Sequence, residues 1–192
     1  VHGADQLAQH VEIARLLAGP LQRPIEALDR WAFILRADPE HHDALAAVEG
    51  ALGDLDLRVQ AADILRPVYA GSAQDARLAE LSLRQSEWTD DQTTKLRALA
   101  EVVQLREHRL GDKAGAFEAQ LLALRHAPGS SQMADVVAET ERLAGELGRE
   151  ADLIDAYRAV APEVFDAEIQ RRLYLDIADL ARAVRRDLDL AR

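Results

Sequence analysis

Residues 96–128 read LRALAEVVQLREHRLGDKAGAFEAQLLALRHAP, and this stretch decides the fold class. Leu and Ala recur at helical spacing on both sides of a short turn, Leu110-Gly111-Asp112. Pro128 follows the second segment, and because proline cannot continue a helix interior it marks the junction to the next element. The stretch therefore predicts two helices joined by a tight turn.

A similar pattern of residues occurs earlier in the chain. Three residues of this stretch correspond to three others that lie 89 positions before them, namely Ala116 to Ala27, Gln120 to Trp31, and Pro128 to Pro39. A further turn, Leu147-Gly148-Arg149, follows later. Repeated helix–turn–helix units stack into open arrays that usually hold other proteins.

Helix signals divide the whole chain into about ten segments, which predicts an all-α fold. Ala, Leu, Arg and Glu favour helix, and no run of alternating residues has strand character. The expected helices are 5–18, 24–37, 40–52, 56–70, 72–88, a long one up to 110, then 113–126, 130–147, 150–160 and 166–186. Short connections predict antiparallel neighbours.

Three local signals refine these bounds. Asp38-Pro39 is expected to supply the cap and the first-turn proline of the third helix. Pro67 lies inside the fourth helix and predicts a kink or an early end there. Thr89 with Gln92 has the spacing of a capping box at the start of the sixth helix.

The chain resembles the tetratricopeptide repeats, a family of helical hairpins about 34 residues long. Leu110-Gly111-Asp112, Ala116, Ala123 and Pro128 match the family's pattern in residues 96–128. Pro39 with Ala27 and Trp31 anchors a copy over 5–39, and Tyr157 takes the aromatic position of a copy over 130–162. A partial copy covers 166–192 and suggests a fragment of a longer array, while the helix pairing within 41–88 stays open. The resemblance implies one α-solenoid domain over 1–192.

The resemblance also implies a binding surface. In the family, the first helix of each pair lines a concave face that holds a protein or an extended peptide. Carried onto this chain, the residues of that putative groove are Gln9, Glu12, Glu101, His108, Asp135, Arg142, Arg182 and Arg185.

The composition of the chain limits the classes of partner and site that we expect. A formal net charge of −11 argues against nucleic acid, which requires a basic surface. There is no Cys to supply a thiolate metal site or a nucleophile. No apolar run approaches the ~20 residues needed to cross a bilayer, so no membrane insertion is expected. The compartment stays open, with the cytoplasm favoured.

Few residues of the sequence are candidates for metal binding or catalysis. Glu40-His41-His42-Asp43 is the densest set of metal-ligand types, but adjacent helical residues point about 100° apart and do not converge. His108 and His126 lie near expected helix C-termini, where a charged imidazole suits the helix dipole, and no catalytic motif accompanies them. Trp31 shares a stripe with Leu28 and Leu35 and is expected in the core.

These observations favour a non-enzymatic scaffold that binds a protein or peptide without a cofactor or metal. Two alternatives stay open. The chain could be a structural spacer or self-association segment of a longer repeat protein, or a regulatory module of a larger signalling protein.

Overall fold

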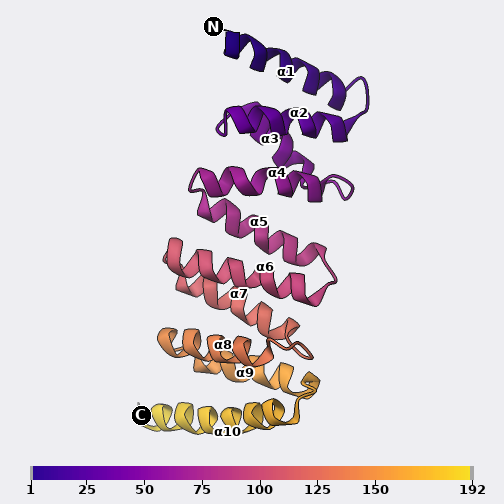
Figure 1. Cartoon of the computed structure of the whole chain (residues 1–192). Helices are drawn as coiled ribbons and strands as arrows, with labels where there is room; N and C mark the ends of the chain where they lie inside the picture. Colours follow the sequence, from indigo (N-terminus) through magenta and orange to yellow (C-terminus); the bar gives the residue numbers. More distant parts are fainter. Residues whose placement is uncertain (1, 191–192) are drawn as a thin grey trace. The chain divides into compact units, whose positions relative to one another are not determined.

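The computed structural model describes residues 2–190, and the side chains of residues 6–183, as an all-helical chain (Figure 1). Ten α-helices lie in this range: α1 (His2–Ala18), α2 (Pro24–Ala37), α3 (His42–Ala51), α4 (Arg58–Gly71), α5 (Asp75–Trp88), α6 (Gln92–Gln104), α7 (Lys113–His126), α8 (Met133–Leu147), α9 (Glu150–Val160) and α10 (Ala167–Leu190). A π-helical turn, η1 (Leu105–Arg109), follows α6, and a 3-10 turn, η2 (Ala161–Glu163), follows α9. The all-α prediction is confirmed.

The helices form two compact units, unit 1 (Val1–Leu81) and unit 2 (Ser82–Arg192), and the division falls within α5. Contacts in each unit run mainly between consecutive helices. In unit 1 they join α1 to α2, α2 to α3 and α3 to α4, and α2 also touches α4. In unit 2 they join α6 to α7 and so on to α10, and α7 also touches α9. Each unit is therefore a series of neighbouring helices, as the short connections predict.

The predicted bounds of α2, α7 and α9 agree with the structure, whereas the two predicted helix caps are wrong. The cap of α3 is His41, whose Nδ1 accepts a hydrogen bond from the Ala44 amide at 3.3 Å, while Asp38 ends α2. The cap of α6 is Asp91, whose carboxylate accepts from the Thr94 amide at 2.8 Å, so the capping box at Thr89 is wrong. A carboxylate is the stronger acceptor, and the Gln92 side chain instead donates to the carbonyl oxygens of His126 and Pro128.

Pro67 does not end its helix, because α4 continues for four residues beyond it to Gly71. Proline has no amide hydrogen, so it cannot donate to the carbonyl of Asp63, its partner one turn earlier. Packing offsets this loss, since Leu65, Val68 and Tyr69 on either side of Pro67 are buried.

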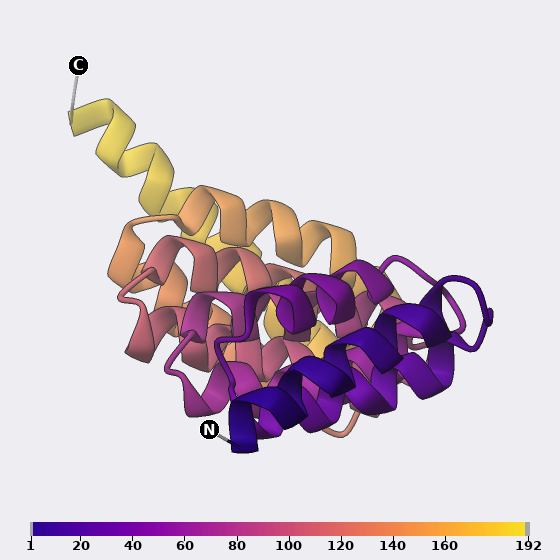
Figure 2. The same cartoon turned by 90° about the horizontal axis from the view of Figure 1, so that it is seen from above.

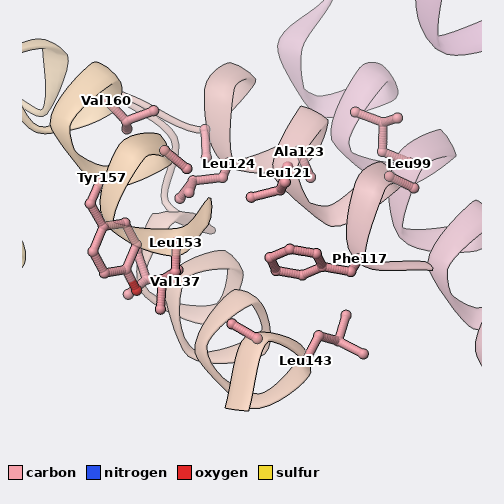
Figure 3. Close-up of a cluster of buried hydrophobic side chains, with 14 of the residues drawn as sticks. Leu99, Phe117, Leu121, Ala123, Leu124, Val137, Leu143, Leu153, Tyr157 and Val160 are labelled. Atoms are coloured by element: carbon pink, nitrogen blue, oxygen red, sulfur yellow. The ribbon is translucent and has the colours of Figure 1, made fainter. Parts of the chain in front are cut away.

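Each unit has apolar side chains at the positions that the helical spacing indicates. In unit 1, α2 buries Ala27, Leu28, Trp31, Ile34 and Leu35, which confirms the core position of Trp31. In unit 2, the core is built around Phe117, Leu124, Leu143 and Tyr157 (Figure 3). Ala116 and Ala123, the small residues of the repeat pattern, are 0% and 3% exposed, so they allow close approach of the neighbouring helices.

Helix α10 is the longest element of the described range and follows α9 through η2. Its C-terminal part extends past the other helices of unit 2 (Figure 2). Its Leu173 is fully buried in the core, while Ile177 and Leu180 pack against the core from the same helix face. Within the described residues, no helix combines the length and apolar character of a membrane span.

Candidate functional site

A cleft of about 550 Å³ lies between α2 and α4 in unit 1. Its lining residues are Asp29, Ala32, Leu35, Arg36, Pro39, Gln60, Asp63, Ile64, Pro67, Val68, Gly71 and Ser72. We call this feature the α2–α4 cleft. It is larger than a single side chain and is open to ligands from solvent.

Helical spacing explains why these residues face the cleft. On α2 the core stripe of Leu28, Trp31 and Leu35 points into unit 1, which turns Asp29, Ala32 and Arg36 to the neighbouring side. These three recur every three or four residues and form the α2 wall of the cleft. The α4 wall combines apolar Ile64, Pro67 and Val68 with polar Gln60 and Asp63.

The polar groups of the cleft are concentrated at the end where α4 begins. The Gln60 amide nitrogen Nε2 donates to Asp29 Oδ1 at 2.9 Å. Asp63 lies one turn beyond Gln60, and its carboxylate has no hydrogen bond or ion pair within the part of the chain that the structure describes. Its main-chain carbonyl lacks the helical donor that Pro67 removes. This end of the cleft is therefore rich in acceptors and carries two carboxylates.

Arg36 carries the positive charge of the cleft lining. It lies seven residues after Asp29 on α2, which is about 10 Å along the helix axis. Its Nε donates to the carbonyl oxygen of Ala32 at 3.2 Å. The Arg36 side chain thus turns back along α2 toward Ala32, and the apolar residues Leu35, Ile64 and Val68 also line the cleft.

The groove residues predicted in unit 1 do not line this cleft. Gln9 and Glu12 are exposed on α1. Arg15 donates to Glu12 at 2.9 Å and to Asp43 at 2.7 Å, which ties α1 to the start of α3. Glu12 therefore belongs to a surface ion-pair network, which contributes little to stability.

In unit 2 the structure brings two of the predicted groove residues to a common partner, Glu107. Arg142 donates from Nη1 and Nη2 to the two oxygens of Glu107, at 2.9 and 2.6 Å. His108 Nε2 lies 3.9 Å from the same carboxylate. The Glu107 side chain is 5% exposed, so this is a nearly buried bidentate pair joining η1 to α8.

Further carboxylates complete the set around Arg142. Glu139 and Glu146 on α8 each accept from its guanidinium, and Lys113 pairs with Glu146 at 2.5 Å. Hydrogen bonding from Arg142 holds the pKa of Glu107 below its ordinary value, although burial acts in the opposite direction. The carboxylates, Glu139 first, raise the pKa of Arg142. Arg142 is thus built into the fold as a cross-link between η1 and α8.

The remaining predicted groove residues are dispersed over unit 2. The Glu101 carboxylate accepts from Ser82 Oγ at 2.7 Å. Asp135 is exposed on α8, and Arg182 pairs with Asp179 on α10 at 2.8 Å. Arg185 has its backbone in α10, but its side chain lies outside the described residues. The structure describes no common pocket for these residues.

The structure also describes the residues that the sequence offered for metal binding and catalysis. No group of three or more His, Asp or Glu side chains that could hold a metal lies within the described residues. Burial lowers the pKa of His126, with help from the nearby charges of Lys95 and Arg125. Both effects favour the neutral form of the His126 imidazole.

Comparison with protein-family models, with curated protein sequences and with solved structures gives no match. The functional argument rests on the geometry above. Sequence reasoning missed Asp29, Gln60 and Asp63 because a cleft between α2 and α4 depends on how two helices separated by α3 approach each other. The available signal was the stripe of Asp29, Ala32 and Arg36 opposite the core face of α2.

Proposed function

We propose that this chain is a segment of a tetratricopeptide-like α-solenoid and acts as a non-enzymatic scaffold that holds a protein or an extended peptide. The α2–α4 cleft is the observation that carries this proposal. The consecutive packing of helices and the repeated punctuation of the sequence support the repeat architecture.

The lining of the cleft suits recognition of a short peptide segment. Ala32, Ile64 and Pro67, which are half-buried or exposed, offer apolar area for an aliphatic side chain of the partner. The carboxylates of Asp29 and Asp63 and the guanidinium of Arg36 offer polar contacts beside it. Ser72 Oγ already donates to the Val68 carbonyl at 2.7 Å, so its proton serves the end of α4. A few polar groups around an apolar floor are typical of binding pockets.

Peptide selection with a blocked cleft tests the proposal. A random peptide library displayed on phage is selected on the whole chain, and the affinity of enriched peptides is measured for two variants. Ala32→Phe places a large side chain in the cleft, whereas Ala37→Phe makes the same change at the exposed last residue of α2, outside the lining. Circular dichroism checks that both variants fold.

We expect peptides whose affinity falls at least tenfold with Ala32→Phe and changes less than twofold with Ala37→Phe. If no enriched peptide responds to Ala32→Phe while the variant remains folded, the cleft is not a peptide site and the proposal fails.

One observation favours the self-association alternative. Tyr174 and Leu175 on α10 are 51% and 55% exposed, which leaves aromatic and aliphatic area at the surface of unit 2. Sedimentation equilibrium of the chain and of a Tyr174→Ser, Leu175→Ser double variant separates the alternatives. A concentration-dependent dimer that the double variant loses would support self-association through α10, and a monomer in both would remove it.

A further inference from the structure

Helix α4 contains two residues that disfavour a helix, Pro67 and Gly71. Proline and glycine have the lowest helix propensities of all residues, and both occur here within the last five residues of the helix. They are four residues apart, so they lie on one face of α4, and both line the α2–α4 cleft. The wall of the cleft is thus the place where α4 departs from a helix-forming sequence.

Packing and backbone conformation do not require these two residues. Pro67 and Gly71 are both exposed, and the neighbours of Pro67 fill the core instead. A Cβ atom added to Gly71 would meet nothing within 4 Å beyond its own stretch of helix backbone. Its φ also lies outside the left-handed region that favours glycine. An alanine at either position would fit the fold and favour the helix more, so the feature that the two residues share is the cleft.

Both residues make the main chain of α4 accessible from the cleft. Because Pro67 has no amide hydrogen, the main-chain carbonyl of Asp63 lacks its helical donor, and Asp63 lines the same cleft. Gly71 has no side chain, so another main chain can approach α4 closely there. The Val68 carbonyl, by contrast, accepts from the amide and the hydroxyl of Ser72 at 3.0 and 2.7 Å. The Asp63 carbonyl is therefore an acceptor that a ligand in the cleft can use.

We infer that the α2–α4 cleft recognises the main chain of an extended peptide, whose N–H group donates to the Asp63 carbonyl and whose backbone passes over Gly71. This inference rests on the proposed function and specifies the conformation of the peptide. A helix uses its N–H groups for its own hydrogen bonds, whereas an extended segment offers them to a partner. Asp63 and Gly71 lie about 12 Å apart along the helix axis, which an extended peptide spans with about four residues.

The first test gives the Asp63 carbonyl its donor back. Pro67→Ala restores the missing amide hydrogen, so the Asp63 carbonyl becomes bonded within α4. The variant should unfold at a higher Tm than the parent protein, because alanine favours a helix. Its affinity for a cleft-dependent peptide, defined as one that loses affinity with Ala32→Phe, should nevertheless fall at least fivefold. A gain in stability together with a loss of binding cannot result from damage to the fold.

A pair of glycine variants provides the matched control. Gly71→Ala adds a methyl group to the wall of the cleft, and Gly50→Ala adds one at an exposed position in the last turn of α3, outside the lining. An added Cβ meets nothing within 4 Å at Gly50 either. Both variants should raise Tm by about 2–4 °C. Only Gly71→Ala should weaken the peptide, by several-fold, while Gly50→Ala should leave its affinity within twofold.

The second test changes the main chain of the peptide. Each amide of a cleft-dependent peptide is replaced in turn by an ester, which removes one N–H group and keeps every side chain. Fluorescence anisotropy of the labelled peptides should show a loss of at least fivefold at one position with the parent protein. The same ester should cost less than twofold with Pro67→Ala, because the hydrogen bond is already absent there.

The outcomes separate the inference from the proposed function. The inference would be overturned by a Pro67→Ala variant that binds as tightly as the parent protein or has a lower Tm. An ester scan without a sensitive position, or with equal losses in both proteins, would overturn it too. The proposed function would survive these results, whereas the absence of any peptide sensitive to Ala32→Phe would remove both. Weaker binding at a raised Tm, with an ester effect that depends on Pro67, would support the inference.

Discussion

Units 1 and 2 contain the same three-helix tie. In unit 1, Tyr69 on α4 donates its hydroxyl to Glu49 on α3 at 2.8 Å, and Arg77 on α5 donates to the same carboxylate at 2.8 Å. In unit 2 the tie uses Tyr157 on α9, Glu141 on α8 and Arg172 on α10, at 3.0 and 2.8 Å. A carboxylate on one helix thus holds a tyrosine from the next helix and an arginine from the one after.

The two units differ in how their other polar groups are satisfied. Unit 2 pairs its internal charges within the chain, through Arg142 with Glu107 and through Arg149 with Glu118. In unit 1 the printed polar contact between α2 and α4 is a neutral donor on a carboxylate, because Gln60 Nε2 donates to Asp29 Oδ1 at 2.9 Å. The difference indicates that similar series of helices can be joined by polar contacts of different charge.

The largest expected effect removes the cross-link that unit 1 lacks. Arg142→Met leaves the nearly buried Glu107 carboxylate without its bidentate donor, and we expect the free energy of unfolding to fall by about 3 kcal/mol. Arg158→Met is the matched control, because Arg158 makes an exposed pair with Asp155 at 3.4 Å and should matter by less than about 0.5 kcal/mol. Urea unfolding followed by circular dichroism gives both values. Equal losses for the two variants would show that the Glu107 pair is not a stabilising feature of unit 2.

The pair of Arg142 with Glu107 should also determine part of the pH dependence of the free energy of unfolding. The pKa of Glu107 is lowered from its ordinary value of 4.5, so its contribution to stability is present above that value and is lost as the pH falls through the lowered pKa. In Arg142→Met the hydrogen bonds are gone and burial alone would raise the pKa of Glu107. That variant should therefore regain stability relative to the parent protein as the pH is lowered from 7 towards 4. A stability difference between the two proteins that is constant with pH would contradict the assignment.

The hydrogen bonds that Tyr69 and Tyr157 donate to carboxylates predict similar losses of stability in the two units. Tyr157→Phe and Tyr69→Phe each remove a hydroxyl that donates to a carboxylate, and each should cost about 1.5 kcal/mol. Tyr174→Phe, at a half-exposed position on α10, is the control and should cost less than about 0.5 kcal/mol. If only one of the two buried tyrosines responds, the tie is not equivalent in the two units.

The smallest effect comes from Arg149 at the start of α9. Arg149→Gln removes its ion pairs with Glu118 and Asp152 and should lower stability by about 1 kcal/mol, since the Arg149 side chain is 32% exposed and its pairs are partly solvated. The loss should shrink in 1 M salt, where ion pairs are screened. A loss that does not change with salt would assign the effect to packing on Phe117 instead.

The sequence predicted the helices well because their signals are local. Periodic Leu and Ala, with Pro24 and Gly148 near helix ends, determine α2 and α8 through propensity and capping alone. The predicted cap of α6 is wrong because the carboxylate of Asp91 is a stronger hydrogen-bond acceptor than the hydroxyl of Thr89, two residues before it.

The candidate site could not be predicted in the same way. It depends on the approach of α2 to α4, and no local pattern encodes the distance between helices that are not consecutive.

The most direct test of the proposed function is a crystal structure of the chain with a cleft-dependent peptide. If the α2–α4 cleft is the binding site, the peptide will lie against Ala32, Ile64 and Pro67. A peptide bound elsewhere on the chain, with these residues uncovered, would contradict the account.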